Sequence, residues 1–396
     1  MRFKRIDQID VKGKNVLIRV DYNVPIENGK VLENKRIVES LPTLKYLIEN
    51  GSKIIILSHL GRPKGFDKKF SLFPVKEELE KLLNIEILFI EDFLKDGVKE
   101  KIDSLPFPSL VMFENVRFFK GEKEGEEQYV NKLSSFGDIY VNDGFAVSHR
   151  KEASIYNLPL KMKEKCAGLL LSKEIENLSK LNENPSKPYV FVVGGSKVST
   201  KLTIIDNIMN NASTVIIGGA LSFTFLKSQG FSVGKSLVED DMLDECKKIF
   251  KMANEKMVNV LLPLDFVVAK NLEGGGKRIE KRESLKEDDL GLDIGPLSIE
   301  IFKASLKDSK TIVWNGPMGY FENPLFVNGT FEIGKAIAEE TKKGAFTVAG
   351  GGDSLLAIDK LNLFSSFSFI STGGGAMLEF LGGVEMPGIK VLEEVL

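Results

Sequence analysis

The chain has 396 residues, 43% of them hydrophobic and 28% charged, which is enough for roughly two to three domains of about 150 residues with buried cores. Its 54 basic and 56 acidic residues give a net charge of −2, which excludes a globally basic protein that binds nucleic acid or a membrane surface. Two cysteines and two histidines are too few for a disulfide framework or a four-cysteine zinc site. No apolar run approaches the ~18 residues of a membrane span, and residues 1–10 contain no apolar signal core, so we expect a cytoplasmic protein.

Short apolar runs recur along the chain at spacings that suit crossover connections rather than hairpins. They do not alternate with polar residues, which is typical of parallel strands buried on both faces. The runs lie at 15–20, 53–57, 86–90, 109–113, 138–141, 189–193, 214–218, 259–264, 311–314, 346–350 and 367–370.

Stretches with helical spacing separate these runs. In one of them Val75, Leu79, Leu82 and Leu83 follow each other at i, i+4, i+7 and i+8. This alternation predicts an α/β fold with right-handed crossovers.

A break in the pattern predicts two lobes. A helix is expected at about 169–182, and Pro185 and Pro188 stop it. We therefore expect two doubly wound parallel-sheet lobes of Rossmann type, residues 1–168 and 169–381, joined by this helix, with a ligand cleft between them.

In the first half, the strands end in cations and hydrogen-bonding groups. Ligands of open α/β sheets bind beyond the carboxyl ends of the strands, and arginine suits carboxylate and phosphate because it is permanently charged and bidentate. The residues at these ends, or soon after them, are Asp21, Tyr22, Asn23, Arg36, His59, Leu60, Gly61, Arg62, Arg117, His149 and Arg150. Four arginines at this topological position predict one basic cleft for an anion.

In the second half, the strands end in glycine. Glycine lets a phosphate or a flat base approach backbone N–H groups at a helix N-terminus. The loops are 194–201, which includes Gly195, Lys197 and Lys201, then Gly219, then Gly351, Gly352, Asp353 and Ser354, and finally Gly373 and Gly374. Asp353 is a candidate Mg²⁺ contact, because Mg²⁺ often uses one or two carboxylates together with phosphate oxygens. An anion-binding lobe and a phosphate-cradling lobe together favour phosphoryl transfer, which depends on positioning and charge neutralisation.

Two nucleotide-binding motifs of other enzyme classes, the P-loop and GxGxxG, are not found in this sequence. Residues 230–236 resemble a P-loop but have three residues between the glycines instead of four, so we interpret them as a surface turn. No GxGxxG follows the first strand of either lobe, which weakens a nicotinamide oxidoreductase.

Nine motifs together resemble those of phosphoglycerate kinases, in the family's order and over essentially the whole chain. They are RVDYNVP (19–25), SHLGRP (58–63), ENVRFF (114–119), VNDGFAVSHR (141–150), GGSKVSTK (194–201), LDIGP (292–296), WNGPMGYFE (314–322), GGGDS (350–354) and STGGGA (371–376). Gly144–Ser148, Ser196, Ser354 and Tyr22 depart from the family's more usual residues, but none of these departures removes a charged group.

The resemblance implies reversible, Mg²⁺-dependent phosphoryl transfer between ATP and 3-phosphoglycerate, giving ADP and 1,3-bisphosphoglycerate, as a glycolytic step of a monomeric enzyme. It implies that Arg36 and Lys197 stabilise the phosphoryl group in flight and that residues 382–396 return to the first lobe. The implied substrate residues are Asp21, Tyr22, Asn23, Arg36, His59, Leu60, Gly61, Arg62, Arg117 and Arg150. The implied nucleotide residues are Gly195, Lys197, Lys201, Gly219, Gly291, Leu292, Asn315, Glu322, Gly351, Gly352, Asp353, Ser354, Gly373 and Gly374, with Asp353 also the Mg²⁺ contact. Glu322 would bind ribose, and Gly219, Gly291 and Leu292 would form part of the adenine slot.

Two other functions stay open at this point. A nicotinamide oxidoreductase also needs glycine loops, and a non-catalytic two-lobe protein that binds anions also fits a basic cleft. The second alternative leaves unexplained why Lys197, Lys201 and Asp353 accompany the glycines.

Overall fold

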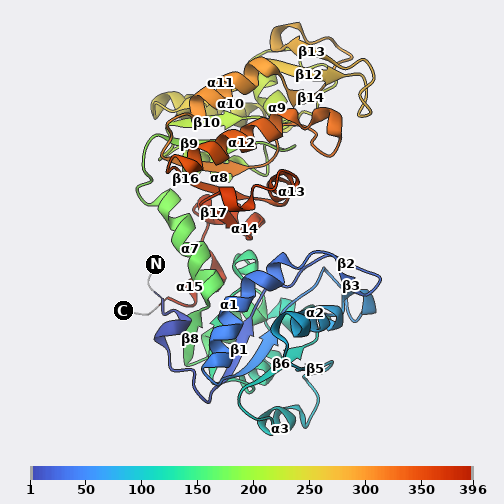
Figure 1. Ribbon diagram of the computed structural model, residues 1–396, viewed down its shortest axis with the longest axis vertical. Coiled ribbons are helices and arrows are strands. Elements are labelled where there is room, and N and C mark those ends of the chain that lie inside the picture. Colours follow the sequence, from blue (N-terminus) through green and yellow to red (C-terminus); the bar gives the residue numbers. More distant parts are fainter. Residues whose placement is uncertain (1–2, 394–396) are drawn as a thin grey trace. The chain divides into compact units, whose positions relative to one another are not determined.

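The structure is a computed structural model and describes residues 3–393 (Figure 1). The chain divides into two compact units. Unit 1 comprises Met1–Glu176 and Glu385–Leu396, and unit 2 comprises Asn177–Val384. The division falls within helix α7 (Leu169–Asn182) rather than before it. The first turn of α7 belongs to unit 1 because the backbone N–H groups of Leu170 and Leu171 both donate to Asp143 Oδ1.

Unit 1 contains a six-stranded parallel sheet in the order β5-β6-β4-β1-β7-β8. Its strands are β1 (Asn15–Arg19), β4 (Lys53–Leu57), β5 (Ile87–Ile90), β6 (Ser109–Phe113), β7 (Ile139–Asn142) and β8 (Glu164–Ala167). β4 is buried along its whole length, as expected for an inner strand of a parallel sheet. β8 has no counterpart among the predicted runs, since it is short and begins with the charged pair Glu164–Lys165.

Helices cover this sheet, and a short hairpin is added to it. The helices are α1 (Lys35–Glu49), α2 (Phe73–Leu83), α3 (Val98–Asp103), α4 (Lys120–Glu124), α5 (Glu127–Ser134) and α6 (Leu158–Lys161), and the hairpin is β2 (Ile26–Glu27) with β3 (Lys30–Val31). The helix predicted from Val75, Leu79, Leu82 and Leu83 is α2. Val75 and Leu79 are buried in the core of unit 1, and Leu82 and Leu83 pack against it.

The end of the chain returns to unit 1. Helix α15 (Pro387–Lys390) lies against the loop that follows β7. The N–H of Gly388 donates to the carbonyl of Ser148 over 2.8 Å, and its carbonyl accepts from the Asn142 side chain over 2.9 Å. A Cβ at Gly388 would lie 2.5 Å from Ile155 Cγ2, so only glycine fits this contact. The final three residues of the predicted returning segment, 394–396, lie outside the described residues.

Unit 2 contains a second six-stranded parallel sheet in the order β11-β10-β9-β15-β16-β17. The strands are β9 (Tyr189–Val193), β10 (Thr214–Ile217), β11 (Asn259–Leu261), β15 (Thr311–Asn315), β16 (Phe346–Gly350) and β17 (Phe369–Ser371). The helices are α8 (Leu202–Ile208), α9 (Leu221–Ser228), α10 (Leu243–Glu255), α11 (Pro296–Leu306), α12 (Asn328–Lys342), α13 (Gly352–Lys360) and α14 (Gly375–Leu381). The predicted α/β class with two parallel sheets is confirmed.

Unit 2 also contains an antiparallel sheet that the sequence pattern did not predict. Its order is β13-β12-β14, with β12 (Asp265–Ala269), β13 (Arg278–Lys281) and β14 (Leu290–Ile294). β13 alternates between half-buried and exposed residues and contains three charged side chains, so it does not form an unbroken apolar run. Figure 1 shows this sheet as a separate layer of unit 2 beside α9 and α11.

Candidate active site

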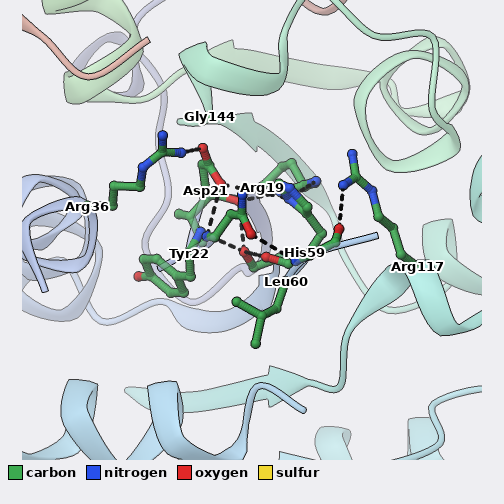
Figure 2. A network of polar contacts seen from close by, with 12 residues as sticks. Arg19, Asp21, Tyr22, Arg36, His59, Leu60, Arg117 and Gly144 are labelled. Carbon is green, nitrogen blue, oxygen red and sulfur yellow. Dashed lines mark hydrogen bonds and ion pairs between the residues drawn. The ribbon is translucent and has the colours of Figure 1, made fainter. Parts of the chain in front are cut away.

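The loops that follow β1, β4, β6 and β7 meet at one edge of the sheet of unit 1. β1 lies between β4 and β7, and the chain crosses from β1 to β4 on one side and later reaches β7 on the other. Such a switch point is where open α/β sheets leave room for a ligand. Figure 2 shows the side chains gathered there.

Asp21 joins the predicted cations at this edge. Arg36 of α1 forms an ion pair with Asp21 Oδ2, and His59 Nδ1 lies 3.8 Å from Asp21 Oδ1. Asn23 Oδ1 accepts the N–H of Gly61 over 2.8 Å, which connects the loop after β1 to the loop after β4. Gly61 has φ +62, and a Cβ there would lie 2.4 Å from the Phe70 ring, so this turn requires glycine.

The predicted arginines differ in how many hydrogen bonds and ion pairs they already make with the protein. The Arg117 guanidinium donates to the Gly61 carbonyl and to Glu152 Oε1, each over 2.8 Å. Its side chain is only 4% exposed, and burial lowers its pKa, an effect that Glu152 partly offsets. Arg150 Nη1 lies 3.9 Å from the same Glu152 oxygen, whereas Arg62 is exposed to solvent.

His59 lies at the centre of the basic cluster. Its pKa is well below the usual value because the ring is buried and because Arg19, Arg117, Arg150 and Arg36 surround it. The imidazole is therefore neutral near pH 7. Four arginines around one uncharged ring form a site whose net positive charge suits a multiply charged anion.

Two predicted substrate residues have buried side chains. The ring of Tyr22 is fully buried in the core, and its hydroxyl hydrogen-bonds to Ser40 Oγ over 2.8 Å. The Leu60 side chain also lies in the core. These two side chains pack the loops from beneath, so their contribution to a ligand site would be through the backbone.

Three residues of this cluster were not singled out from the sequence, namely Arg19, Glu122 and Glu152. Arg19 is the last residue of β1 and is fully buried. Its signal was present, because a lone charge in an otherwise apolar strand must be paired inside the protein. Glu122 and Glu152 lie in charged segments and carry no such signal.

In unit 2, glycine turns pack backbone against backbone at the switch point between β9 and β15. The N–H of Gly194 donates to the Asn315 carbonyl over 2.9 Å, and that of Gly195 to the Pro317 carbonyl over 3.0 Å. A Cβ at Gly219 (φ +64) would lie 2.6 Å from the Gly195 nitrogen and 2.8 Å from the Pro317 oxygen. Side chains are thus excluded here, and backbone groups come to the surface of the site.

Lys201, Asn315, Asp353 and Ser354 adjoin these turns. Lys201 Nζ hydrogen-bonds to Asn315 Oδ1, and burial lowers the pKa of Lys201 while Asp353 raises it. Asp353 lies exposed in the first turn of α13. Ser354 is fully buried and accepts the N–H of Gly316 over 2.6 Å, so its hydroxyl holds a turn of the site. Lys197 is exposed.

A cavity of about 260 Å³ opens beside the glycine turns. Gly195, Gly219, Gly291, Leu292, Glu322 and Asp353, all predicted nucleotide residues, line it. Its apolar wall was not predicted and consists of Phe223, Leu237, Phe266, Leu272, Leu290 and Met318. A Cβ at Gly291 would lie 2.0 Å from the Phe223 ring, so this glycine allows β14 to pack directly on an aromatic side chain. A narrow apolar slot bordered by glycine backbone suits a flat base.

The other predicted nucleotide residues lie near the carboxyl ends of the last two strands. Gly351 and Gly352 form the turn from β16 into α13, and Gly373 and Gly374 precede α14. Gly374 has φ +55. β16 and β17 are parallel to β15, so these loops leave the same edge of the sheet as the loop after β15. Their glycines are not among the residues that line the cavity.

Within residues 3–393, no group of three or more His, Cys, Asp or Glu side chains is arranged to hold a metal ion. No helix in this part of the chain is long and apolar enough to cross a membrane.

Comparisons with known proteins agree over nearly the whole length of the chain. The family model "Phosphoglycerate kinase" matches residues 6–384. The phosphoglycerate kinase of Thermosipho africanus is 50% identical over 387 residues, which cover 97% of this chain and 96% of that protein. The phosphoglycerate kinase of Dictyoglomus turgidum is 45% identical over 386 residues, with 97% of each chain covered.

Solved structures show the same likeness. The phosphoglycerate kinase of Coxiella burnetii superposes with a TM-score of 0.91 at 41% identity and covers 99% of both chains. That of Pyrococcus horikoshii has a TM-score of 0.84 at 32% identity, with 98% of both chains covered. The chain therefore belongs to the phosphoglycerate kinase family, whose members are kinases that transfer phosphate to a carboxyl group.

Proposed function

We propose that this protein catalyses the reversible transfer of a phosphoryl group between ATP and the carboxylate of 3-phosphoglycerate, as a step of glycolysis. The products are ADP and 1,3-bisphosphoglycerate. The observation that carries the proposal is the different chemistry at corresponding edges of the two sheets. Unit 1 has arginines around the neutral His59, and unit 2 has glycine turns, Lys201 and an apolar cavity.

In unit 1, the exposed Arg62 and the partly exposed Arg150 bind the phosphate of 3-phosphoglycerate, together with the side of Arg117 that faces the site. Asp21 accepts a hydrogen bond from the hydroxyl of the substrate, and Asn23, whose Oδ1 already accepts from Gly61, donates through its NH₂ group to the substrate carboxylate. Support comes from the ion pair of Arg36 with Asp21 and the bond from Gly61 to Asn23, which hold these loops in place. A site held in this way does not have to reorganise when the anion arrives.

In unit 2, the purine occupies the apolar cavity, and Glu322, which lines it, accepts a hydrogen bond from the ribose. Lys201 and Lys197 neutralise the phosphates, with the backbone of the glycine turns as further donors. Asp353 is the candidate contact for Mg²⁺ carried on the nucleotide. A single exposed carboxylate fits this role, since Mg²⁺ commonly takes one or two carboxylates and completes its shell with phosphate oxygens and water. The ion, when bound, neutralises phosphate charge.

Transfer is direct and in line, and it requires the two units to close so that the acceptor oxygen meets the terminal phosphoryl group. Closure excludes water, which would otherwise hydrolyse the acyl phosphate. Arg36 and Lys197 then neutralise the charge that spreads over the equatorial oxygens. We further propose that the enzyme acts in the cytoplasm and as a monomer. Size-exclusion chromatography with light scattering can test the monomeric state.

The direct test is an assay with the full-length chain. Incubation with MgATP and 3-phosphoglycerate should release ADP only when both substrates are present, and omission of Mg²⁺ should abolish the release. Replacement of ATP by NADH should give no absorbance change with any candidate acid. Binding of 3-phosphoglycerate in calorimetry without any ADP release would favour a non-catalytic anion-binding protein and refute the proposal.

A further inference from the structure

His59 and Arg19 contact each other inside unit 1. Arg19 ends β1, and His59 follows the neighbouring strand β4, in which Leu57 is the register partner of Arg19. Arg19 is fully buried and His59 is 3% exposed. Arg19 Nη2 lies 3.3 Å from His59 Nδ1, and Figure 2 shows the two side chains side by side.

This contact determines which ring nitrogen carries the proton. A guanidinium has five N–H donors and no acceptor, and it stays charged in proteins. Nδ1 must therefore accept the hydrogen bond, so the proton of the neutral ring is on Nε2. The competing arrangement has Nδ1–H directed at Asp21 Oδ1, but these atoms are 3.8 Å apart, which is too long for a hydrogen bond.

Arg19 is itself held by a chain of buried hydrogen bonds. Its Nε donates to Ser154 Oγ over 2.8 Å, and the Ser154 hydroxyl donates to Glu122 Oε1 over 2.6 Å. The Ser154 backbone N–H donates to the other Glu122 oxygen over 3.1 Å. Ser154 and Glu122 are fully buried. A hydroxyl has one proton, and its donation to Glu122 leaves the Ser154 oxygen free to accept from Arg19.

We propose that Glu122 and Ser154 are positioning residues that hold Arg19 against Nδ1 and so fix His59 as a neutral donor through Nε2. The role of that donor rests on the proposed function: Nε2–H would donate to an anionic oxygen of the three-carbon acid. Among residues 3–393, Nε2 makes no hydrogen bond with the protein, so the donor is available to a ligand.

A neutral donor has a specific advantage at this site. Arg36, Arg117 and Arg150 also face His59. The acids of this set are Asp21, Glu152 and Glu122, and burial raises the pKa of Glu122 to about 7. An imidazolium would add repulsion to this crowded set of cations, whereas the Nε2–H tautomer adds a hydrogen bond without adding charge.

The protonation state can be read directly, because the chain has only two histidines. Protein labelled with ¹⁵N-histidine gives two ring patterns in a long-range ¹H–¹⁵N correlation spectrum, and His59→Gln assigns them. We expect His59 to show the neutral Nε2–H pattern, unchanged between about pH 6 and 8, where an ordinary histidine titrates. A charged ring or an Nδ1–H pattern in the wild-type protein would overturn the inference.

Glu122→Gln tests the positioning role. Both Glu122 oxygens accept from Ser154, and an amide cannot keep both bonds as they are: its NH₂ group either faces the Ser154 backbone N–H or makes the Ser154 hydroxyl accept instead of donate. We expect a detectable Nδ1–H population and a KM for 3-phosphoglycerate raised about 3- to 10-fold, the equivalent of one hydrogen bond, with the KM for ATP unchanged. Ser154→Ala removes the acceptor for Arg19 Nε and should have the same two effects.

Glu124→Gln is the matched control, because Glu124 is on the same short helix but is exposed, and its one ion pair within the described part of the chain is with Lys120 at 3.3 Å. It should leave both the spectrum and the KM unchanged. If Glu122→Gln and Ser154→Ala fold with wild-type circular dichroism but keep the wild-type tautomer and KM, neither is a positioning residue. The spectrum needs no turnover, so an inactive wild-type enzyme with the expected tautomer would refute the proposed function and leave the tautomer assignment standing.

Discussion

The two units place their candidate binding groups at corresponding switch points of similar sheets, but the groups differ in kind: unit 1 uses side chains and unit 2 uses mainly backbone. Unit 1 uses charged side chains that hold one another, as in the contacts of Arg117 with Glu152 and of Arg36 with Asp21. Unit 2 uses backbone, because the turns at Gly194, Gly219 and Gly316 approach too closely for any Cβ. Apart from the groups that reach the transferring phosphoryl group, charge substitutions should therefore weaken ligand binding mainly in unit 1, and added methyl groups should do so mainly in unit 2.

The largest effect is expected where a side chain of either unit reaches the transferring group. Arg36→Ala and Lys197→Ala should each lower kcat by ~10²–10³, the usual loss when one charge-stabilising donor is removed from a transition state. The KM values should change far less. Steady-state kinetics in both directions measures this. Lys45→Ala, an exposed position on the same helix as Arg36, is the control, and a normal kcat in either variant would remove that residue from the mechanism.

The second effect tests the backbone construction of unit 2. In Gly219→Ala, the new methyl group would lie 2.6 Å from the Gly195 nitrogen, so the turn must open. The KM for ATP should rise by ~10-fold or more, the equivalent of about 1.4 kcal/mol or more, while the KM for 3-phosphoglycerate stays unchanged.

Gly230→Ala is a matched control for this effect. Gly230 also has a positive φ, +89, but a Cβ there meets nothing within 4 Å. Both variants therefore carry the strain of alanine in a left-handed conformation, and only Gly219→Ala adds the clash. Equal nucleotide affinities in the two variants would show that close backbone packing is not what shapes the site.

The third effect separates two arginines of unit 1. Arg62→Ala and Arg117→Ala should both weaken 3-phosphoglycerate binding by about 10-fold, through loss of a charge-assisted hydrogen bond, and leave nucleotide binding unchanged. Only Arg117→Ala should also lower the free energy of unfolding, by about 1–3 kcal/mol, because it leaves the carboxylate of Glu152 without its donor. Calorimetric titration with each ligand and urea unfolding measure the two quantities. Loss of both ligands in equal measure would contradict the division between the units.

The same contrast explains what could be predicted from the sequence. Unbroken apolar runs identified the central strands, because strands buried on both faces need such runs. Among the strands that were missed, β8 and β13 contain charged residues and therefore have no such signature. β12 does contain a short apolar run, residues 266–269, directly after the predicted run at 259–264. Arginines after strand ends were recognisable because charge is visible in a sequence.

The rest of the site depends on contacts that only the folded chain shows. Arg19 and Arg117 are held by Glu122, Ser154 and Glu152. These three residues lie far from β1 and β4 in the sequence, so only the folded chain shows that they are partners of the arginines. The apolar wall of the cavity was missed for a related reason. Phe223 and Phe266 lie 43 positions apart in the sequence, and their ring centroids come within 4.5 Å of each other, with the rings tilted, only after β12 and α9 have packed together.

The smallest effect concerns Asp293, a buried acid that lines the cavity of unit 2. Asp293 is 3% exposed, and its oxygens accept the N–H groups of Ile294 and Gly329 over 2.9 and 2.8 Å. Burial raises its pKa from 3.8 to about 7, since these backbone donors offset the lost hydration only in part. Glu152, in contrast, has arginine partners in unit 1.

A raised pKa means that the folded state binds this proton more tightly than the unfolded state does. The stability that protonated Asp293 contributes is fully present below about pH 4 and is lost as the pH rises through about 7. In Asp293→Asn this dependence disappears, so the free energy of unfolding should fall less between pH 5 and 8 than in the wild type, by on the order of 1 kcal/mol or more. Urea unfolding at several pH values measures the slope, with the exposed Asp241→Asn as control. If the slope of Asp293→Asn matched that of the wild type, Asp293 would be ionised throughout, and its carboxylate would be stabilised by the backbone donors together with Lys277.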